Sequence, residues 1–186
     1  MMSVTLTRHR FTVEEYNELI DFGVLSENDR VEFIRGEVVD KMPIGELHLF
    51  CVNQLNRILN RMLGDDAIVS VQNPIRLSDS EPEPDVALLR LCDDSYRSAK
   101  PQANDVLLVI EVADTSLEID RDIKASLYAD AGIPEYWIVN LLDGCVEVHR
   151  HPEANGTYRD RQIVRAGESV SVMAFPNCSI EVSQLL

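Results

Sequence analysis

Two acidic residues interrupt apolar segments of this sequence, and their positions indicate metal chemistry. Glu111 lies inside Val106–Val112, whose other residues are all apolar, and Asp85 begins the preceding apolar segment directly after Pro84. A carboxylate in an apolar strand is costly to desolvate unless it is ion-paired or bound to a metal. If the two segments are neighbouring strands, their carboxylates lie together and favour Mg²⁺ or Mn²⁺ over zinc, which prefers His and Cys. The alternative for Glu111 is a buried ion pair with an arginine.

Lys124 is the third candidate. It lies in Ile119–Ala131, whose periodicity predicts a helix, and it falls at the edge of the apolar stripe of that helix. A lysine there either extends its charged end to solvent or serves a site. Asp120 lies four residues earlier, so Lys124 taken alone is best interpreted as half of a surface pair worth ~0.3 to 0.5 kcal/mol. The expected proximity of the two carboxylates favours a role in the site.

An α/β core must position these residues. Thr12 with two following glutamates predicts a short helix that ends at Gly23, and Gly36 divides Val31–Val39 into a hairpin or a bulged strand. The length of 186 residues predicts a single domain over residues 1–186. The other expected core elements are a helix over His48–Leu63, strands over Ala67–Leu77, Asp85–Leu91 and Val106–Val112, the helix Ile119–Ala131, and a strand over Glu135–Val139. An antiparallel extension is expected from the segments Cys145–Arg150, Tyr158–Val164 and Ser169–Val172.

Composition narrows the classes of function. The chain has 17 Lys and Arg against 32 Asp and Glu, and its net charge of −15 repels polyanions and argues against a broad nucleic-acid-binding surface. The four cysteines are widely spaced, as in reduced proteins, and residues 1–10 lack the apolar core of a secretory signal. No apolar run approaches the ~20 residues that a membrane span needs. We therefore expect a cytoplasmic protein with no membrane partner.

Other chemistries have weaker support. His48 with Cys51, and His149 with His151, have spacings that zinc ligands use, but no second close pair of ligands accompanies either. Cys51 lies beside the apolar stripe of its helix and is expected to be a core thiol rather than a nucleophile. Residues 79–83 are expected to form a solvated, proline-stiffened turn that leads into the site. Glycosidases also use two carboxylates, but a strand glutamate with a helix lysine suits phosphate better.

Four motifs follow one another along the chain in a recognisable order. They are Pro84-Asp85, Ile110-Glu111-Val112-Ala113, the D-x-x-x-K-x-x-x-Y segment from Asp120 to Tyr128, and Gly132-Ile133-Pro134-Glu135-Tyr136-Trp137-Ile138-Val139. Together they resemble the Uma2 family of restriction-endonuclease-like proteins, within the PD-(D/E)xK nuclease superfamily. The resemblance covers most of the chain, and the expected order α-β-β-β-α-β agrees with the core of that superfamily.

The resemblance implies a restriction-endonuclease-like fold and a Mg²⁺- or Mn²⁺-dependent endonuclease that hydrolyses DNA. It implies Asp85 and Glu111 as metal ligands. The superfamily places its lysine two residues after the second acid, where this chain has Ala113, so Lys124 at the matching place on the following helix is implied as the catalytic lysine. Further implied site residues are Glu32 as an additional acid, Gln72 in the pocket, and the Val112 carbonyl as a third metal ligand.

The expected partner, DNA, requires a confined basic surface on so acidic a chain, or else it binds weakly and with a steep salt dependence. A homodimer built on the C-terminal strands would let two sites cut two strands, by analogy with the fold. The alternative function is a catalytically inactive nuclease-fold protein that acts as a binding or assembly module. The candidates for the basic surface are Arg8, Arg10, Arg35, Arg76, Arg90, Arg121 and Lys124.

Overall fold

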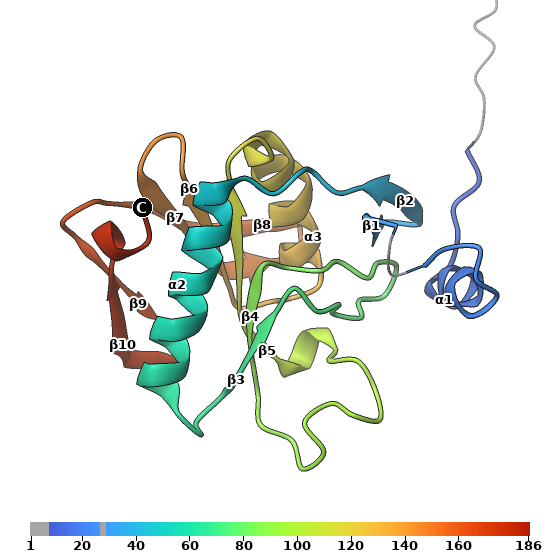
Figure 1. The fold of residues 1–186 in the computed structure, drawn as a ribbon, viewed down its shortest axis with the longest axis horizontal. Coiled ribbons are helices and arrows are strands. Elements are labelled where there is room, and N and C mark those ends of the chain that lie inside the picture. Colours follow the sequence, from blue (N-terminus) through green and yellow to red (C-terminus); the bar gives the residue numbers. More distant parts are fainter. Residues whose placement is uncertain (1–7, 27–28) are drawn as a thin grey trace, which may run out of the picture.

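The computed structural model describes residues 8–26 and 29–186 as a mixed α/β fold (Figure 1). Its helical elements are α1 (Val13–Asp21), α2 (Glu46–Leu63), η1 (Ala103–Asp105), η2 (Ile119–Lys124), α3 (Ala125–Asp130) and η3 (Val182–Gln184). Its strands are β1 (Val31–Ile34), β2 (Glu37–Asp40), β3 (Ile68–Val71), β4 (Val86–Leu89), β5 (Val106–Ala113), β6 (Glu135–Asn140), β7 (Cys145–Glu153), β8 (Thr157–Arg165), β9 (Ser169–Val172) and β10 (Phe175–Glu181).

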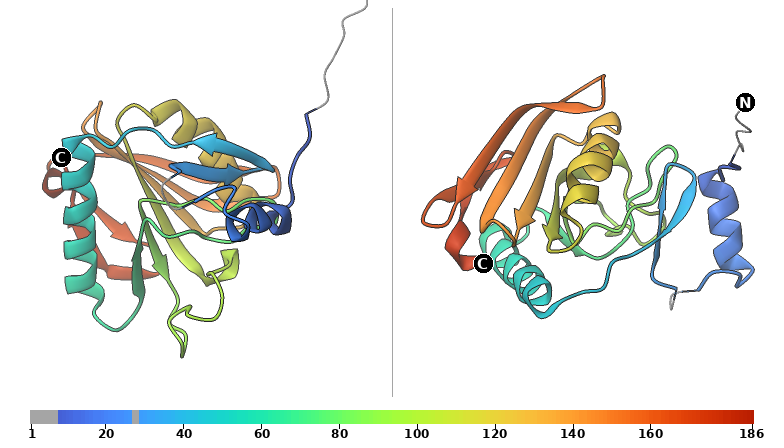
Figure 2. Two further views of the ribbon diagram at one scale, coloured as in Figure 1. Left: turned by 45° about the vertical axis from the view of Figure 1, so that its right-hand side comes forward. Right: turned by 90° about the horizontal axis from the view of Figure 1, so that it is seen from above.

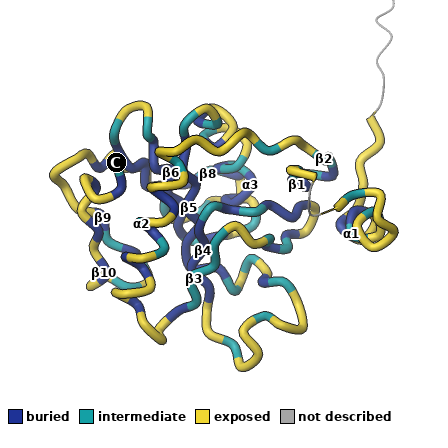
Figure 3. Tube along the Cα trace, viewed as in Figure 1, coloured by how far each residue is buried: buried dark blue, intermediate teal, exposed yellow. Residues whose placement is uncertain are grey.

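A six-stranded mixed sheet forms the centre, with the strand order β3-β4-β5-β6-β7-β8. The pair β5–β6 is parallel and its other pairs are antiparallel. Every residue of β4, β5 and β6 is buried, as Figure 3 shows for the middle of the molecule. Strands that are covered on both faces read as continuous apolar runs, which is why these were recognisable in the sequence. The expected fold class, a mixed sheet flanked by helices, is confirmed.

The two faces of the sheet have different covers (Figure 2). One face packs against α2 and the β9–β10 hairpin, and the opposite face packs against α3. Ile110 and Val112 of β5 belong to the first core, whereas Val109 and Ala113 belong to the second. Because side chains alternate along a strand, Glu111 points to the α3 face. The candidate acid therefore lies on the side of the sheet that carries η2 and Lys124.

The N-terminal helix and hairpin form a separate layer beside this face. The expected cap of α1 is present, since Thr12 and Glu15 satisfy each other's backbone N–H groups. β1 and β2 pair antiparallel through a tight turn in which Arg35 and Gly36 both have positive φ, at 49° and 80°. A Cβ at Gly36 would lie 2.8 Å from the Cβ of Arg10, so glycine also permits the N-terminal segment to approach the turn.

The expectation of a solvated turn over residues 79–83 is wrong. Ser80 and Glu81 are buried because the β1–β2 hairpin lies against them. The Glu81 N–H donates to the carbonyl of Phe33 at 2.7 Å, and the Arg35 N–H donates to Ser80 Oγ at 2.7 Å. The Glu81 carboxylate accepts hydrogen bonds from Lys100 and Asn17, which compensates its burial. Residues 79–83 thus connect the hairpin layer to the body of the protein.

Two other expectations need correction. The strand expected over residues 67–77 ends at Val71, because Gln72 adopts a left-handed φ of 51° and Pro74 has no N–H to donate. The strand expected over residues 85–91 is shorter and covers Val86–Leu89. The helix expected over residues 119–131 begins with the π-helical element η2, in which the Ala125 N–H donates to the Asp120 carbonyl. Such wider turns often occur at functional sites.

The C-terminal strands divide into two groups. β7 and β8 continue the central sheet antiparallel, in agreement with the expected extension. β9 instead pairs with β10, a strand that the sequence pattern did not predict, and this hairpin covers α2's face of the sheet. All four cysteines are free thiols. In residues 8–26 and 29–186, no helix combines the length and apolar character needed to cross a membrane.

Candidate active site

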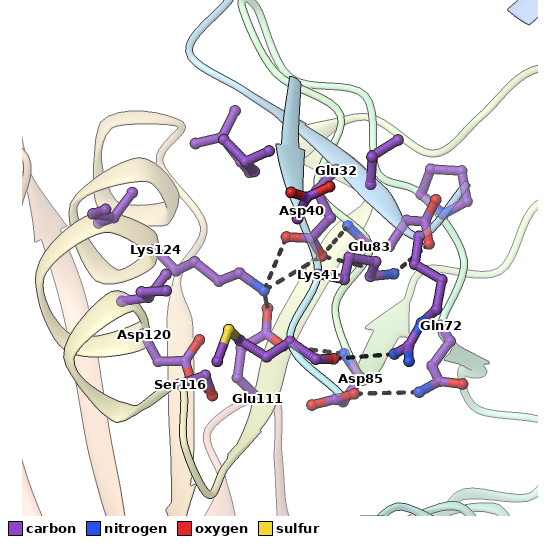
Figure 4. A pocket seen from close by; sticks show the side chains of 18 of the residues that line it. Glu32, Asp40, Lys41, Gln72, Glu83, Asp85, Glu111, Ser116, Asp120 and Lys124 are labelled. Atoms are coloured by element: carbon purple, nitrogen blue, oxygen red, sulfur yellow. Dashed lines mark hydrogen bonds and ion pairs between the residues drawn. The ribbon is translucent and has the colours of Figure 1, made fainter. Parts of the chain in front are cut away.

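Asp85 and Glu111 come together because of the register between β4 and β5. Val86 pairs with Ile110, which places the residue before β4 opposite Glu111. The Asp85 N–H donates to Glu111 Oε2 at 3.3 Å. The sequence-based expectation that these acids would be neighbours therefore agrees with the structure. Figure 4 shows both side chains facing the same cavity.

The Asp85 carboxylate is held from three directions. Its Oδ2 accepts a hydrogen bond from the Val112 N–H at 2.9 Å and lies 3.0 Å from His48 Nε2, at the beginning of α2. Its Oδ1 accepts a longer hydrogen bond, 3.4 Å, from Gln72 Nε2. Burial acts to raise the pKa of Asp85, but the contacts with His48 and Val112 outweigh it and hold the pKa below its usual value. Asp85 is therefore ionised at neutral pH.

Glu111 is held on its other side by the helical layer. Its Oε1 accepts hydrogen bonds from Lys124 Nζ at 3.0 Å and from the Tyr128 hydroxyl at 2.8 Å. The buried ion pair considered for Glu111 exists, but the cation is Lys124 rather than an arginine. Burial raises the pKa of Glu111, which Lys124 opposes and the neighbouring acids reinforce.

Lys124 reaches the carboxylates because it ends the π-helical turn. Its ammonium contacts Glu111 and also lies 3.3 Å from Glu32 Oε2 of β1, with its side chain only 11% exposed (Figure 4). The surface pair with Asp120 is not formed, since Asp120 accepts a hydrogen bond from Ser116 instead. Burial acts to lower the pKa of Lys124, but the charges of Glu111, Glu32 and Asp120 raise it overall, so the lysine is protonated.

A cavity of about 870 Å³ opens over these groups. Its lining comes from the hairpin layer, the turn at Gln72, the beginning of α2, and η2, and it includes all of Glu32, Asp85, Glu111, Val112 and Lys124. The structure thus brings every sequence-derived site residue to one cavity.

Lys41 at this cavity was missed by the sequence reasoning, and its partner Glu83 was expected only as part of the turn that leads into the site. Lys41 Nζ lies 2.5 Å from Glu83 Oε2 and 3.9 Å from Glu32 Oε1. Lys41 follows a half-buried strand and Glu83 lies in an acidic run, so neither stands out by type or spacing. Only the docking of the hairpin on residues 79–83 brings them together. His48 and Tyr128 belong to the segments on which the family resemblance rests. Only the structure shows that His48 contacts Asp85 and that Tyr128 contacts Glu111.

The donor set fits a divalent cation. Four carboxylates, those of Glu32, Asp85, Glu111 and Asp120, act on one another and on the ammonium of Lys124, and the ammonium of Lys41 lies 3.9 Å from Glu32, so carboxylates outnumber ammonium groups beside the cavity. In the described ranges, no three His, Cys, Asp or Glu side chains converge as a preformed metal cage. Mg²⁺ does not need one, since it keeps several waters and is usually held by one or two carboxylates. Asp85 and Glu111 match that requirement.

The expected confined basic surface is largely neutralised by the chain itself. Of its candidate cations, Arg90 donates to the carbonyl of Asn104 and the others are ion-paired. The exposed pairs among them contribute little to stability, yet all of the pairs, including the buried pair Lys124–Glu111, reduce the field that a polyanion would meet. The pairs are Arg8–Glu37, Arg10–Glu37, Arg35–Asp130, Arg76–Glu14, Arg121–Glu147 and Lys124–Glu111.

A family model and a solved structure show what this chain is similar to. The family model "Uma2: Putative restriction endonuclease" matches residues 13–183. No curated protein matches the chain. Among solved structures, the chain is similar to a protein from Anabaena variabilis ATCC 29413 described as "a putative nuclease belonging to DUF820", with 15% identity and a TM-score of 0.70. The alignment covers 88% of this chain and 94% of that one, and at this identity it shows a shared fold.

Proposed function

The chain belongs to the Uma2 family, and from this premise we propose that it is a Mg²⁺- or Mn²⁺-dependent endonuclease that hydrolyses phosphodiester bonds of DNA. The description of the family as restriction endonucleases supports a nuclease. The observation that carries the finer proposal is the meeting of Asp85, Glu111 and Lys124 in one cavity, from β4, β5 and η2. Two carboxylates beside a buried ammonium suit a reaction in which negative charge accumulates on phosphorus.

Asp85 and Glu111 would hold the cation, with the Val112 carbonyl as a third oxygen. When bound, a divalent cation supplies Lewis acidity and activates water. Among the described residues, Oδ1 of Asp85 accepts only the 3.4 Å hydrogen bond from Gln72, and Oε2 of Glu111 accepts only the 3.3 Å bond from the Asp85 N–H, since Lys124 and Tyr128 both contact Oε1 of Glu111. The same carboxylates can therefore keep their protein contacts while they bind a ligand.

Lys124 would stabilise the charge of the transition state. Its ammonium lies between Glu111 and Glu32, close enough to the proposed metal ligands to meet a phosphate oxygen in the cavity. A protonated lysine supplies fixed positive charge at no cost of reorganisation during the reaction. Glu32 serves as a positioning residue in this proposal, because its carboxylate holds the ammonium from the hairpin side.

The direct test is nicking of a supercoiled plasmid in Mg²⁺ or Mn²⁺. We expect Asp85→Ala, Glu111→Ala and Lys124→Ala to lose at least 100-fold in rate, since each removes a group that touches the metal or the phosphate. Asp66→Ala, which removes an exposed carboxylate after α2, is the matched control and should nick as the wild type does. Identical nicking by the wild type and all site variants would identify a contaminant and contradict the proposal.

Calorimetric titration with Mn²⁺ tests the site without a substrate. The wild type should bind Mn²⁺, and Glu111→Ala should not. Absence of binding by the folded wild type would favour the alternative, a catalytically inactive nuclease-fold module. The proposed homodimer is tested separately by size-exclusion chromatography with light scattering, where a monomer at micromolar concentration would contradict it.

A further inference from the structure

The groups proposed to act on phosphate lie at the floor of a recess. The side chains of Glu111, Lys124 and Asp85 are 4%, 11% and 13% exposed. A phosphodiester must therefore enter the cavity to reach them. A cavity of about 870 Å³ belongs to the size class that encloses a small molecule or a short piece of a chain.

The wall on the hairpin side is firmly joined to the body of the protein. β1 is bridged to the buried segment at Glu81, and the Gly36 N–H donates to the Asp79 carbonyl at 3.0 Å. The buried carboxylate of Glu81 is itself tied to Lys100 and to Asn17 of α1. These contacts fix the hairpin beside η2, so the recess is a feature of the packed fold (Figure 4).

The rim of the recess carries exposed apolar side chains as well as cations. Met42 and Ile44, which follow the hairpin, are 43% and 46% exposed, and Ile119 and Ile123 of η2 are 41% and 46% exposed. All four line the cavity. Arg10, Arg30 and Lys41 line the same cavity, where cations can meet the charged backbone of a nucleic acid. The exposed apolar side chains match the faces of sugars and bases, which a single strand leaves uncovered.

These observations favour a single strand over an intact duplex as the substrate. In a duplex the bases are paired and stacked inside, and the stiff helix presents its phosphates on a convex surface. To bring a phosphate to the floor of this recess, a duplex would have to bend or unpair locally, whereas a single strand can enter without that cost. We propose, resting on the nuclease function above, that this site accepts a single strand of DNA, either free or as the unpaired arm of a forked duplex.

Cleavage of three labelled substrates of one sequence tests the proposal: a single strand, its blunt duplex, and a forked duplex with an unpaired arm. In Mn²⁺ we expect the single strand and the unpaired arm to be cut at least tenfold faster than the duplex. Cuts in the fork should fall within the unpaired arm. Equal or faster cutting of the duplex would overturn the proposal.

Binding measured without cleavage separates this proposal from the nuclease function. Fluorescence anisotropy in Ca²⁺ with the wild type should show at least tenfold tighter binding of the single strand than of the duplex. Selective binding of the single strand without any cutting in Mg²⁺ or Mn²⁺ would refute the nuclease and support strand recognition. Equal affinity for both forms would overturn strand recognition, whatever the cleavage result.

A pair of matched variants tests the apolar side chains of the rim. Ile123→Asn removes a rim side chain, whereas Ile163→Asn changes an isoleucine of β8 that is 55% exposed and lies outside the cavity lining. We expect Ile123→Asn to weaken single-strand binding about fivefold, within the range for loss of an apolar contact to a base, and Ile163→Asn to leave it unchanged. Wild-type affinity in both variants would show that the strand does not pass the rim and would overturn the proposal.

Discussion

Replacing Lys124 with methionine isolates the charge of the buried lysine. Its ammonium lies 3.0 Å from Glu111 Oε1 and 3.3 Å from Glu32 Oε2, and the two carboxylate side chains are 4% and 7% exposed. Methionine has a similar length and a similar helix propensity, so Lys124→Met removes the charge with little change in packing or in the stability of the helix. What changes is the electrostatic balance of two buried acids.

The magnitude follows from these distances. With an effective dielectric constant of ~20, each contact attracts by about 5 kcal/mol, or about 10 kcal/mol together. Desolvation of the lysine offsets several kcal/mol of this attraction. The variant also leaves the buried carboxylate of Glu111 without its cation, while Glu32 keeps only the 3.9 Å contact with Lys41. We therefore expect the free energy of unfolding to fall by about 3–5 kcal/mol, the range for removing one partner of a buried pair.

Urea denaturation at pH 7 in EDTA measures this loss. Lys41→Met is the matched control, because Lys41 pairs with Glu83 nearer the surface, where the side chains are 23% and 32% exposed, and it should lose about 1 kcal/mol or less. The deficit of Lys124→Met should shrink at pH 5, because protonation removes the charge of an unpaired carboxylate whose folded-state pKa lies above its unfolded value. A Lys124→Met protein as stable as the wild type would refute the reasoning, as desolvation would then cancel the attraction. Equal losses in both variants would refute it as well.

Three further outcomes are expected. Burial lowers the pKa of His149 to about 4, below the unfolded value of ~6.5, so this residue should contribute a loss of about 1–2 kcal/mol in unfolding free energy as pH falls from 7 to 5. In urea denaturation His149→Phe should show a flatter pH dependence, and an unchanged dependence would contradict the assignment. Gly36→Ala, at φ +80 with a backbone oxygen 3.0 Å from the new Cβ, should lose about 1–3 kcal/mol in the same assay, and more than Gly23→Ala, at φ +70 in open space. Iodoacetamide at pH 8, followed by mass spectrometry, should label Cys92 and spare the native Cys51, whose pKa burial raises to about 12; preferential labelling of Cys51 would contradict this.

Hydrophobic periodicity made much of the fold predictable. The apolar runs of β5 and β6 and the helical spacing of α2 appear in the sequence because each element buries a known face. Glu111 was detectable for the same reason, since an acid conflicts with an apolar run. The end of β3 at Val71 and the π-helical form of η2 were not detectable, because they depend on a few backbone angles that packing selects.

The contacts within the site could not be predicted from the sequence, because they join residues that are distant along the chain. Glu32 and Lys124 are separated by 92 residues, and no local pattern of either records the other. The burial of Ser80 and Glu81 likewise arises from a hairpin more than forty residues earlier, as the contact between Arg35 and Ser80 spans 45 residues. Composition had led to the opposite expectation, because an acidic run with prolines is usually solvated.

The sequence by itself determined the fold class, the family, and the three residues on which a metal-dependent site would rest. The fold class follows from apolar residues that repeat with the period of a helix or strand. The site residues were recognisable because charged residues conflict with the apolar segments around them. The tertiary structure alone decided that the lysine is protonated, that Lys41 joins the site, and that its floor lies in a recess lined by exposed apolar side chains and by cations. The physical reason is that charge balance, burial and shape depend on segments that are distant in the chain and adjacent only after folding.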